Sequence, residues 1–170
     1  MRALRLSENN NKKYQYPLRE KDADILLNRN IYLDTQREMR KMQENEIGTY
    51  IVNTAIDIHR QTGPGLLEKV YEVILANQLH KQGLKVERQV AIPIDYDGIR
   101  FEEGFRADLI IENKVIIELK CVEKLNNAHR KQLLTYLRLS NMHLGYLLNF
   151  SESLMKHGIH RTVNRLVETT

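Results

Sequence analysis

Cysteine and long apolar segments are nearly absent from this sequence of 170 residues. The single cysteine, Cys121, excludes an intramolecular disulfide and a cysteine-rich metal cluster. No apolar run approaches the roughly 20 residues that a membrane-spanning helix requires. Residues 1–30 also lack the apolar centre of a secretory signal peptide. We therefore expect a cytoplasmic protein without a membrane partner.

The sequence also lacks a strong excess of charge of either sign. The formal net charge is +4, and residues 1–45, with ten Lys/Arg and seven Asp/Glu, carry +3 of it. Residues 46–170, with sixteen and fifteen, carry only +1. There is neither a long basic helix nor an aromatic-rich stacking face. Overall charge is therefore weak evidence for a nucleic-acid partner.

The length indicates one domain with an appendage. Residues 1–44 contain a polar Asn/Lys tract and sparse apolar positions, so we expect a weakly structured or helical extension. A basic arm that contacts phosphates is the alternative for this segment. Residues 45–170 carry the regular apolar patterns and form the predicted domain.

Apolar periodicity predicts the order of helices and strands in that domain. The expected helices run from an N-cap at Asn45 to before Gly63, from Leu66 to Gln82, and from Asn126 or Asn127 to about Ser140. The expected strands cover 86–96, 99–103 with an interruption at Gly104, 105–111, 115–121 and 145–150, followed by an edge strand or short helix. This order predicts an α/β fold with a mixed central sheet flanked by helices. A three-strand meander leads through a helical crossover into a parallel strand.

Two charged residues, Glu118 and Lys120, stand in the otherwise apolar strand at 115–121. Side chains alternate along a strand, so both point to the same face as Ile116. Charges on an apolar strand are costly to bury unless a partner neutralises them. They form either a structural Lys–Glu pair on the sheet surface or part of a functional site.

Asp108 supplies a third charge on the preceding strand. A hairpin with a three-residue loop sets Asp108 opposite Glu118, and the same register sets Arg106 opposite Lys120. Two carboxylates at that separation repel unless one is protonated or a cation lies between them. Mg²⁺ prefers carboxylate oxygens, and Lys120 beside the ion could polarise a water or stabilise charge on a phosphate. The residues thus predict a metal-dependent phosphodiesterase site, with a solvated Asp108 as the alternative.

Two helices carry further candidates. Glu68 falls inside the apolar arc of its predicted helix, where a carboxylate needs a partner such as a metal site on the neighbouring sheet. The alternative is a glutamate that the helix dipole favours at the N-terminus. Gln132 and Tyr136 are four residues apart on the later helix and therefore share a face.

The order of these residues resembles the PD-(D/E)XK nuclease superfamily. An Asp strand, a following Glu-x-Lys strand, a preceding helical Glu and a later Gln-x-x-x-Tyr share its arrangement. Within it, the segment 65–71, Gly-Leu-Leu-Glu-Lys-Val-Tyr, is similar to the signature of small bacterial GxxExxY proteins. The similarity covers roughly residues 45–164. Ala107 replaces the Pro of the superfamily, which removes only a backbone constraint.

The resemblance implies a restriction-endonuclease-like core of about four to five strands in the order ααβββαβ. It also implies that Asp108 and Glu118 bind Mg²⁺, or Mn²⁺, and that Glu68 joins them or orients a water. Lys120 would position or activate the attacking water. Gln132, with Tyr136 behind it, would support Lys120 or a substrate phosphate. Arg106 would be a substrate-binding residue.

The function implied by the resemblance is a Mg²⁺-dependent nuclease that hydrolyses phosphodiester bonds in DNA. One alternative is a non-catalytic nucleic-acid-binding or regulatory module on the same fold, with salt-sensitive binding and no turnover. A protein-interaction domain that acts through its helices is another. Neither the strand preference nor the oligomeric state can be read from the residues.

Overall fold

The computed structural model describes residues 42–166. Its regular elements are α2 Glu44–Thr62, α3 Glu68–Lys81, β1 Val86–Tyr96, β2 Ile99–Ile111, β3 Val115–Lys120, α4 Asn127–Leu139, β4 Leu144–Asn149, α5 Met155–Gly158 and β5 Ile159–Val163. The extension predicted for residues 1–44 lies almost wholly outside the described residues. Within the described part of the chain, no helix is both long and apolar enough to cross a membrane.

The five strands form one mixed sheet in the spatial order β1-β2-β3-β4-β5. The first three are antiparallel neighbours. α4 then crosses over to β4, which runs parallel to β3, and β5 pairs antiparallel with β4 at the edge. Ile111 pairs with Val115, the register that a three-residue hairpin loop requires. The predicted α/β fold with a restriction-endonuclease-like order is confirmed.

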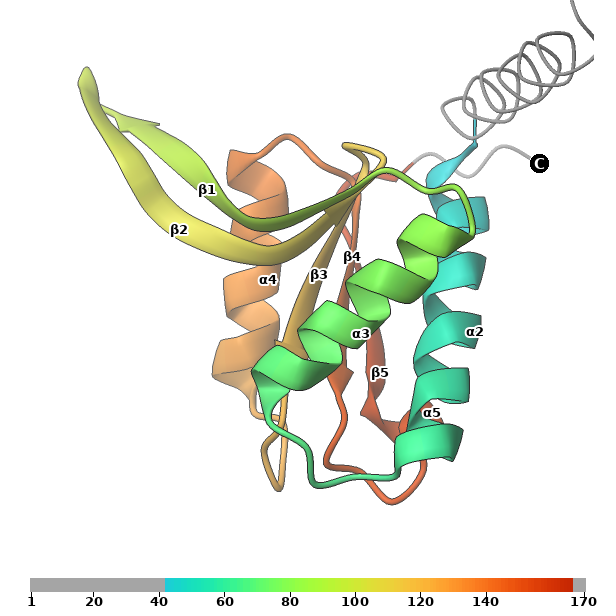
Figure 1. The fold of residues 1–170 in the computed structure, drawn as a ribbon. Helices are drawn as coiled ribbons and strands as arrows, with labels where there is room; N and C mark the ends of the chain where they lie inside the picture. The colour runs from blue at the N-terminus through green and yellow to red at the C-terminus, as the bar shows by residue number, and fades with distance from the viewer. Residues whose placement is uncertain (1–41, 167–170) are drawn as a thin grey trace, which may run out of the picture. The chain divides into compact units, whose positions relative to one another are not determined.

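Helices cover both faces of the sheet, with α2 and α3 on one side and α4 on the other (Figure 1). β3 contributes side chains to the hydrophobic cores on both faces of the sheet, because successive side chains of a strand point to opposite faces. Val115, Ile117 and Leu119 pack in the core beneath α2 and α3. Ile116 packs in the second core, beneath α4. The face that carries Ile116 is also the face predicted to carry Glu118 and Lys120.

β1 and β2 form a long hairpin that extends beyond the rest of the sheet (Figure 1). β2 is one strand through Gly104 rather than two, but its pairing with β1 is irregular there, because Ile92 pairs with Phe105 and Ile94 with Phe101. Ile94 of β1 lies directly over the glycine, at a place that a Cβ would fill. The register shifts between Ile92 and Ile94, and Pro93, which has no N–H to donate, lies at that shift.

α2 has a different N-cap from the one predicted. Its N-cap is Gln43, which forms a reciprocal capping box with Glu46; Gln43 N donates to Glu46 Oε2 at 2.8 Å. Asn45 therefore lies inside the first turn, where its side chain accepts a hydrogen bond from Arg161 at 2.8 Å. The helix ends at Thr62, before Gly63, as predicted.

α3 begins at Glu68, two residues after the predicted start at Leu66. The Tyr71 hydroxyl donates to Gly63 O at 2.6 Å, which holds the preceding segment as a loop. Leu67 belongs to this loop and is 75% exposed rather than part of the apolar face of the helix. Glu68 is consequently the first residue of α3.

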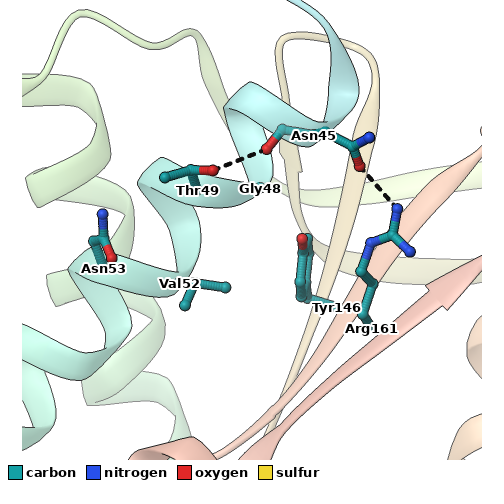
Figure 2. A pocket seen from close by; sticks show the side chains of 7 residues that line it. All are labelled: Asn45, Gly48, Thr49, Val52, Asn53, Tyr146 and Arg161. Carbon is teal, nitrogen blue, oxygen red and sulfur yellow. Dashed lines mark hydrogen bonds between the residues drawn. The ribbon is translucent and has the colours of Figure 1, made fainter. Parts of the chain in front are cut away.

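Close contact between α2 and β4 requires a glycine at position 48. A Cβ on Gly48 would overlap the hydroxyl of Tyr146, whose ring lies buried under the helix (Figure 2). Overpacking of this kind costs about 1–3 kcal/mol, because the Tyr146 ring or the helix must shift to admit the methyl group.

Gly48→Ala should therefore lower the melting temperature by several degrees, at about 2–4 °C per kcal/mol. The higher helix propensity of alanine offsets only about 1 kcal/mol of the clash. Thermal unfolding checks this, with Asn53→Ala on the exposed part of the same helix as the control. In a Tyr146→Phe background the loss should shrink. An equal loss in both backgrounds would contradict the contact as the cause.

Candidate active site

The candidate site lies at the carboxyl end of β3, where its ladder with β2 stops. The last paired residues are Leu109 and Ile117. Asp108 comes next on β2, and its Oδ2 accepts a hydrogen bond from the backbone N–H of Leu119 at 2.9 Å. A side-chain oxygen thus takes the place of a backbone acceptor. This holds the Asp108 carboxylate against β3.

Glu118 is the buried carboxylate of the site, with 5% of the residue exposed. Its Oε2 lies 3.6 Å from Lys120 Nζ. Its Oε1 is buried and has no hydrogen-bond partner among the described residues. Burial, followed by the negative charge of Asp108, raises the pKa of Glu118 from 4.5 to about 8, although Lys120 acts in the opposite direction. An unpaired buried oxygen of this kind requires a proton or a cation.

Lys120 connects carboxylates from two parts of the fold. Its Nζ lies 3.6 Å from Glu118 Oε2 and 3.9 Å from Glu68 Oε1. The other oxygen of Glu68 accepts a hydrogen bond from the N–H of Cys121 at 3.2 Å. The first turn of α3 is therefore tied to the end of β3, and the N-terminus of that helix favours the negative charge.

The structure brings four of the predicted residues to one place: Glu68 from α3, Asp108 from β2, and Glu118 and Lys120 from β3. Asp108 acts on Glu118 electrostatically, and Lys120 lies within ion-pair distance of Glu118 and Glu68. Their catalytic and metal-binding roles stay predictions.

Tyr136 and Gln132 face this site from α4. The Tyr136 ring is nearly buried and stacks on Phe105, with ring centroids 3.6 Å apart. Gln132, which is exposed, donates a hydrogen bond from its side-chain amide to the Tyr136 hydroxyl. Burial raises the pKa of Tyr136, and the negative charges of Glu118 and Asp108 raise it further. The hydroxyl is thus within electrostatic range of both carboxylates.

Arg106 is an exposed residue of β2, two positions before Asp108. Its Nε donates to Glu103 at 2.8 Å, and its Nη1 donates to the backbone oxygen of Gln89 at 2.9 Å. The paired register between β2 and β3 does not extend to Arg106 and Lys120. A role of Arg106 in substrate binding stays a prediction.

Two residues that the sequence analysis did not select, Gln89 and Glu72, also contact the site. Gln89 Nε2 donates to Asp108 Oδ1 at 3.2 Å and to Glu72 Oε2 at 2.9 Å. Glu72 is one helical turn after Glu68, so the four-residue spacing indicated that both carboxylates share a face of α3. Nothing comparable in the sequence marked Gln89.

The donor set fits a hard divalent cation. Within residues 42–166, no three His, Cys, Asp or Glu side chains are grouped closely enough to hold a metal ion. Mg²⁺ needs fewer protein ligands, because it is usually bound through one or two carboxylates and keeps several waters. Asp108 and the unpartnered oxygen of Glu118 would meet that requirement. A cation there would offset both causes of the raised pKa of Glu118, burial first and then the negative charge of Asp108.

A comparison with known protein families shows to which superfamily this chain belongs. Residues 45–162 match the family model described as PD-(D/E)XK nuclease superfamily. The chain belongs to that superfamily. Neither the search of curated proteins nor the search of solved structures finds a match. Because PD-(D/E)XK proteins are usually metal-dependent nucleases, the general function is of nuclease type. The resemblance to GxxExxY proteins is narrower than this match and stays a prediction.

Proposed function

We propose that this chain is a Mg²⁺-dependent deoxyribonuclease of the GxxExxY kind that acts in the cytoplasm. The observation that carries the proposal is the unpartnered, buried oxygen of Glu118 between Asp108 and Lys120. A structural Lys–Glu pair would leave no reason to bury an additional acidic oxygen without a donor. A site that receives a cation gives that oxygen a partner.

Asp108 and Glu118 hold the Mg²⁺ ion, or Mn²⁺, in this proposal. Glu68 supplies a third carboxylate or orients a water from α3. When bound, the ion supplies positive charge to the phosphate and lowers the pKa of a water. The hydrogen bond from Leu119 keeps Asp108 turned towards Glu118.

Lys120 positions the attacking water and stabilises negative charge that develops on the phosphate. Its Nζ is held between the oxygens of Glu68 and Glu118, so the ammonium is already oriented before substrate binds. Gln132 and Tyr136 lie on the adjacent helix and contact a substrate phosphate or support Lys120. Arg106 binds the nucleic acid further along β2.

Cleavage of DNA by the wild-type protein tests this function. We expect supercoiled plasmid DNA to be nicked or degraded with Mg²⁺ or Mn²⁺ and to remain intact with a chelator. Single-stranded DNA and a matched RNA, assayed in parallel, separate deoxyribonuclease from ribonuclease activity. Cleavage of the RNA but of neither DNA would contradict DNA as the substrate. If none of the three nucleic acids is cleaved, the protein is not a nuclease.

A non-catalytic nucleic-acid-binding module is the second candidate. The observation in its favour is the absence, among residues 42–166, of a group of three metal-ligating side chains. It predicts binding of DNA that weakens steeply with salt, and no turnover with either metal. Gel-shift and cleavage assays on the same preparation distinguish the two functions.

A further inference from the structure

Gln89 adopts a backbone conformation that strands rarely contain. Its φ is +51°, in the left-handed region that disfavours residues with a side chain. It lies in β1 between Arg88, which pairs with Leu109, and Val90, which pairs with Ala107. Asp108 lies between those two partners. The irregularity in β1 is therefore directly across from the acidic residue of β2.

Both strands change the face that they present to the cores at this point. Residues two apart on a regular strand share a face. Yet Leu109 packs beneath α2 and α3, whereas Ala107 packs beneath α4. On β1, Val86 packs against the first core and Val90 against the second. Strained backbone is retained where the surrounding structure requires it, often at functional sites.

The side chain of Gln89 uses both hydrogens of its amide nitrogen on acidic partners. One bond reaches Asp108 Oδ1 at 3.2 Å and the other reaches Glu72 Oε2 at 2.9 Å. Both acceptors are carboxylates, so the donor must be the amide nitrogen. Because Leu119 N–H binds Asp108 Oδ2, each oxygen of Asp108 has one fixed donor. Each oxygen keeps a second lone pair for another partner.

Glu72 provides a rigid support for this amide. It is 3% exposed and accepts hydrogen bonds from Arg88 Nε at 2.9 Å and from Lys69 Nζ at 2.7 Å. Arg88 and Lys69 thus neutralise the buried Glu72 carboxylate, which also accepts the hydrogen bond from Gln89. The contacts form a continuous connection from α3 through β1 to Asp108.

We propose that Gln89 is a positioning residue that fixes the Asp108 carboxylate for metal binding. This inference rests on the proposed function. Groups that hold metal ligands in place typically contribute about 10–100-fold to metal affinity or activity. The left-handed backbone places the Gln89 amide between Glu72 and Asp108, which explains why the strain is kept.

Gln89→Gly tests this role, because glycine accepts the left-handed backbone while the side chain and its amide are removed. Calorimetric titration of Mn²⁺ should show affinity weaker by about 10–100-fold. At saturating Mg²⁺, kcat should fall while KM for DNA stays near the wild-type value. Asn113→Gly is the matched control, since Asn113 has φ +54° in the exposed β2–β3 turn. It should leave the metal affinity and kcat unchanged.

Hydrogen exchange without metal gives a second readout that does not depend on nuclease activity. The Leu119 amide should exchange faster in Gln89→Gly, because its acceptor on Asp108 is no longer fixed. The Phe150 amide, which donates to Lys120 O at 2.9 Å, should not change. Unchanged Leu119 exchange, or wild-type Mn²⁺ affinity in the variant, would overturn the positioning role. A wild type that binds Mn²⁺ but cleaves nothing would overturn only the proposed function.

Discussion

Asp108→Asn should lower metal-dependent DNA cleavage by about 10³-fold or more. The metal contributes several kcal/mol of charge stabilisation, and each 1.36 kcal/mol corresponds to a factor of about ten in rate. Asparagine keeps the shape of the side chain and an oxygen that can accept from Leu119, so the fold should persist. The charge that attracts the cation is lost. Plasmid cleavage with Mg²⁺ measures the effect.

Lys120→Ala belongs to the same prediction and should lower cleavage by about 10²–10⁴-fold. The substitution removes the only cation that ion-pairs with Glu118 among the described residues. Lys131→Ala, on the exposed side of α4, is the control and should cleave as wild type. Thermal unfolding of each variant verifies that it is folded. Substantial activity in both Asp108→Asn and Lys120→Ala would place the chemistry elsewhere.

Glu118→Gln should stabilise the metal-free protein at alkaline pH. The pKa of Glu118 is raised from 4.5 to about 8 in the folded protein, so the native state binds the proton more tightly than the unfolded state. Wild-type stability therefore falls as pH rises from 4.5 to about 8. The glutamine has no charge to bury and escapes this loss. At about pH 9, we expect its melting temperature to exceed that of wild type by roughly 5 °C or more.

Melting curves across the pH range, with and without Mg²⁺, measure this difference. The two proteins should melt alike well below pH 4.5, where Glu118 is protonated in both the folded and the unfolded state. Mg²⁺ should raise the melting temperature of wild type at alkaline pH, because it binds only the native state. It should have little effect on Glu118→Gln. Glu123→Gln, on the exposed loop after β3, is the control. A less stable Glu118→Gln at alkaline pH would show that the carboxylate has a structural partner.

The fold and most of the candidate site follow from alternation along short apolar strands. The alternation in 115–121 assigned Glu118 to the face of Ile116, which the structure packs beneath α4, and the three-residue loop fixed the register of β2 and β3. Local spacing was sufficient there because both strands are regular. The four-residue spacing of Gln132 and Tyr136 likewise placed both side chains on one face of α4.

Contacts between distant residues explain what the sequence did not predict. Ile94 packs over Gly104 within β2, and no periodicity conveys that contact. Leu67 falls within the helix predicted from Leu66 to Gln82, but the Tyr71 hydroxyl holds its segment in a loop. The sequence did not indicate Gln89, because its contacts depend on a left-handed backbone conformation. At that residue the strand changes which of its side chains face each core.

Anomalous diffraction from crystals grown with Mn²⁺ tests the central claim most directly. The claim is that Asp108 and Glu118 share one cation at the end of β3, beside Lys120 and Glu68. We predict one strong anomalous peak in contact with oxygens of Asp108 and Glu118, including the Glu118 oxygen that lacks a partner. Crystals with saturating Mn²⁺ and no peak there, in a protein that still cleaves DNA, would contradict the account.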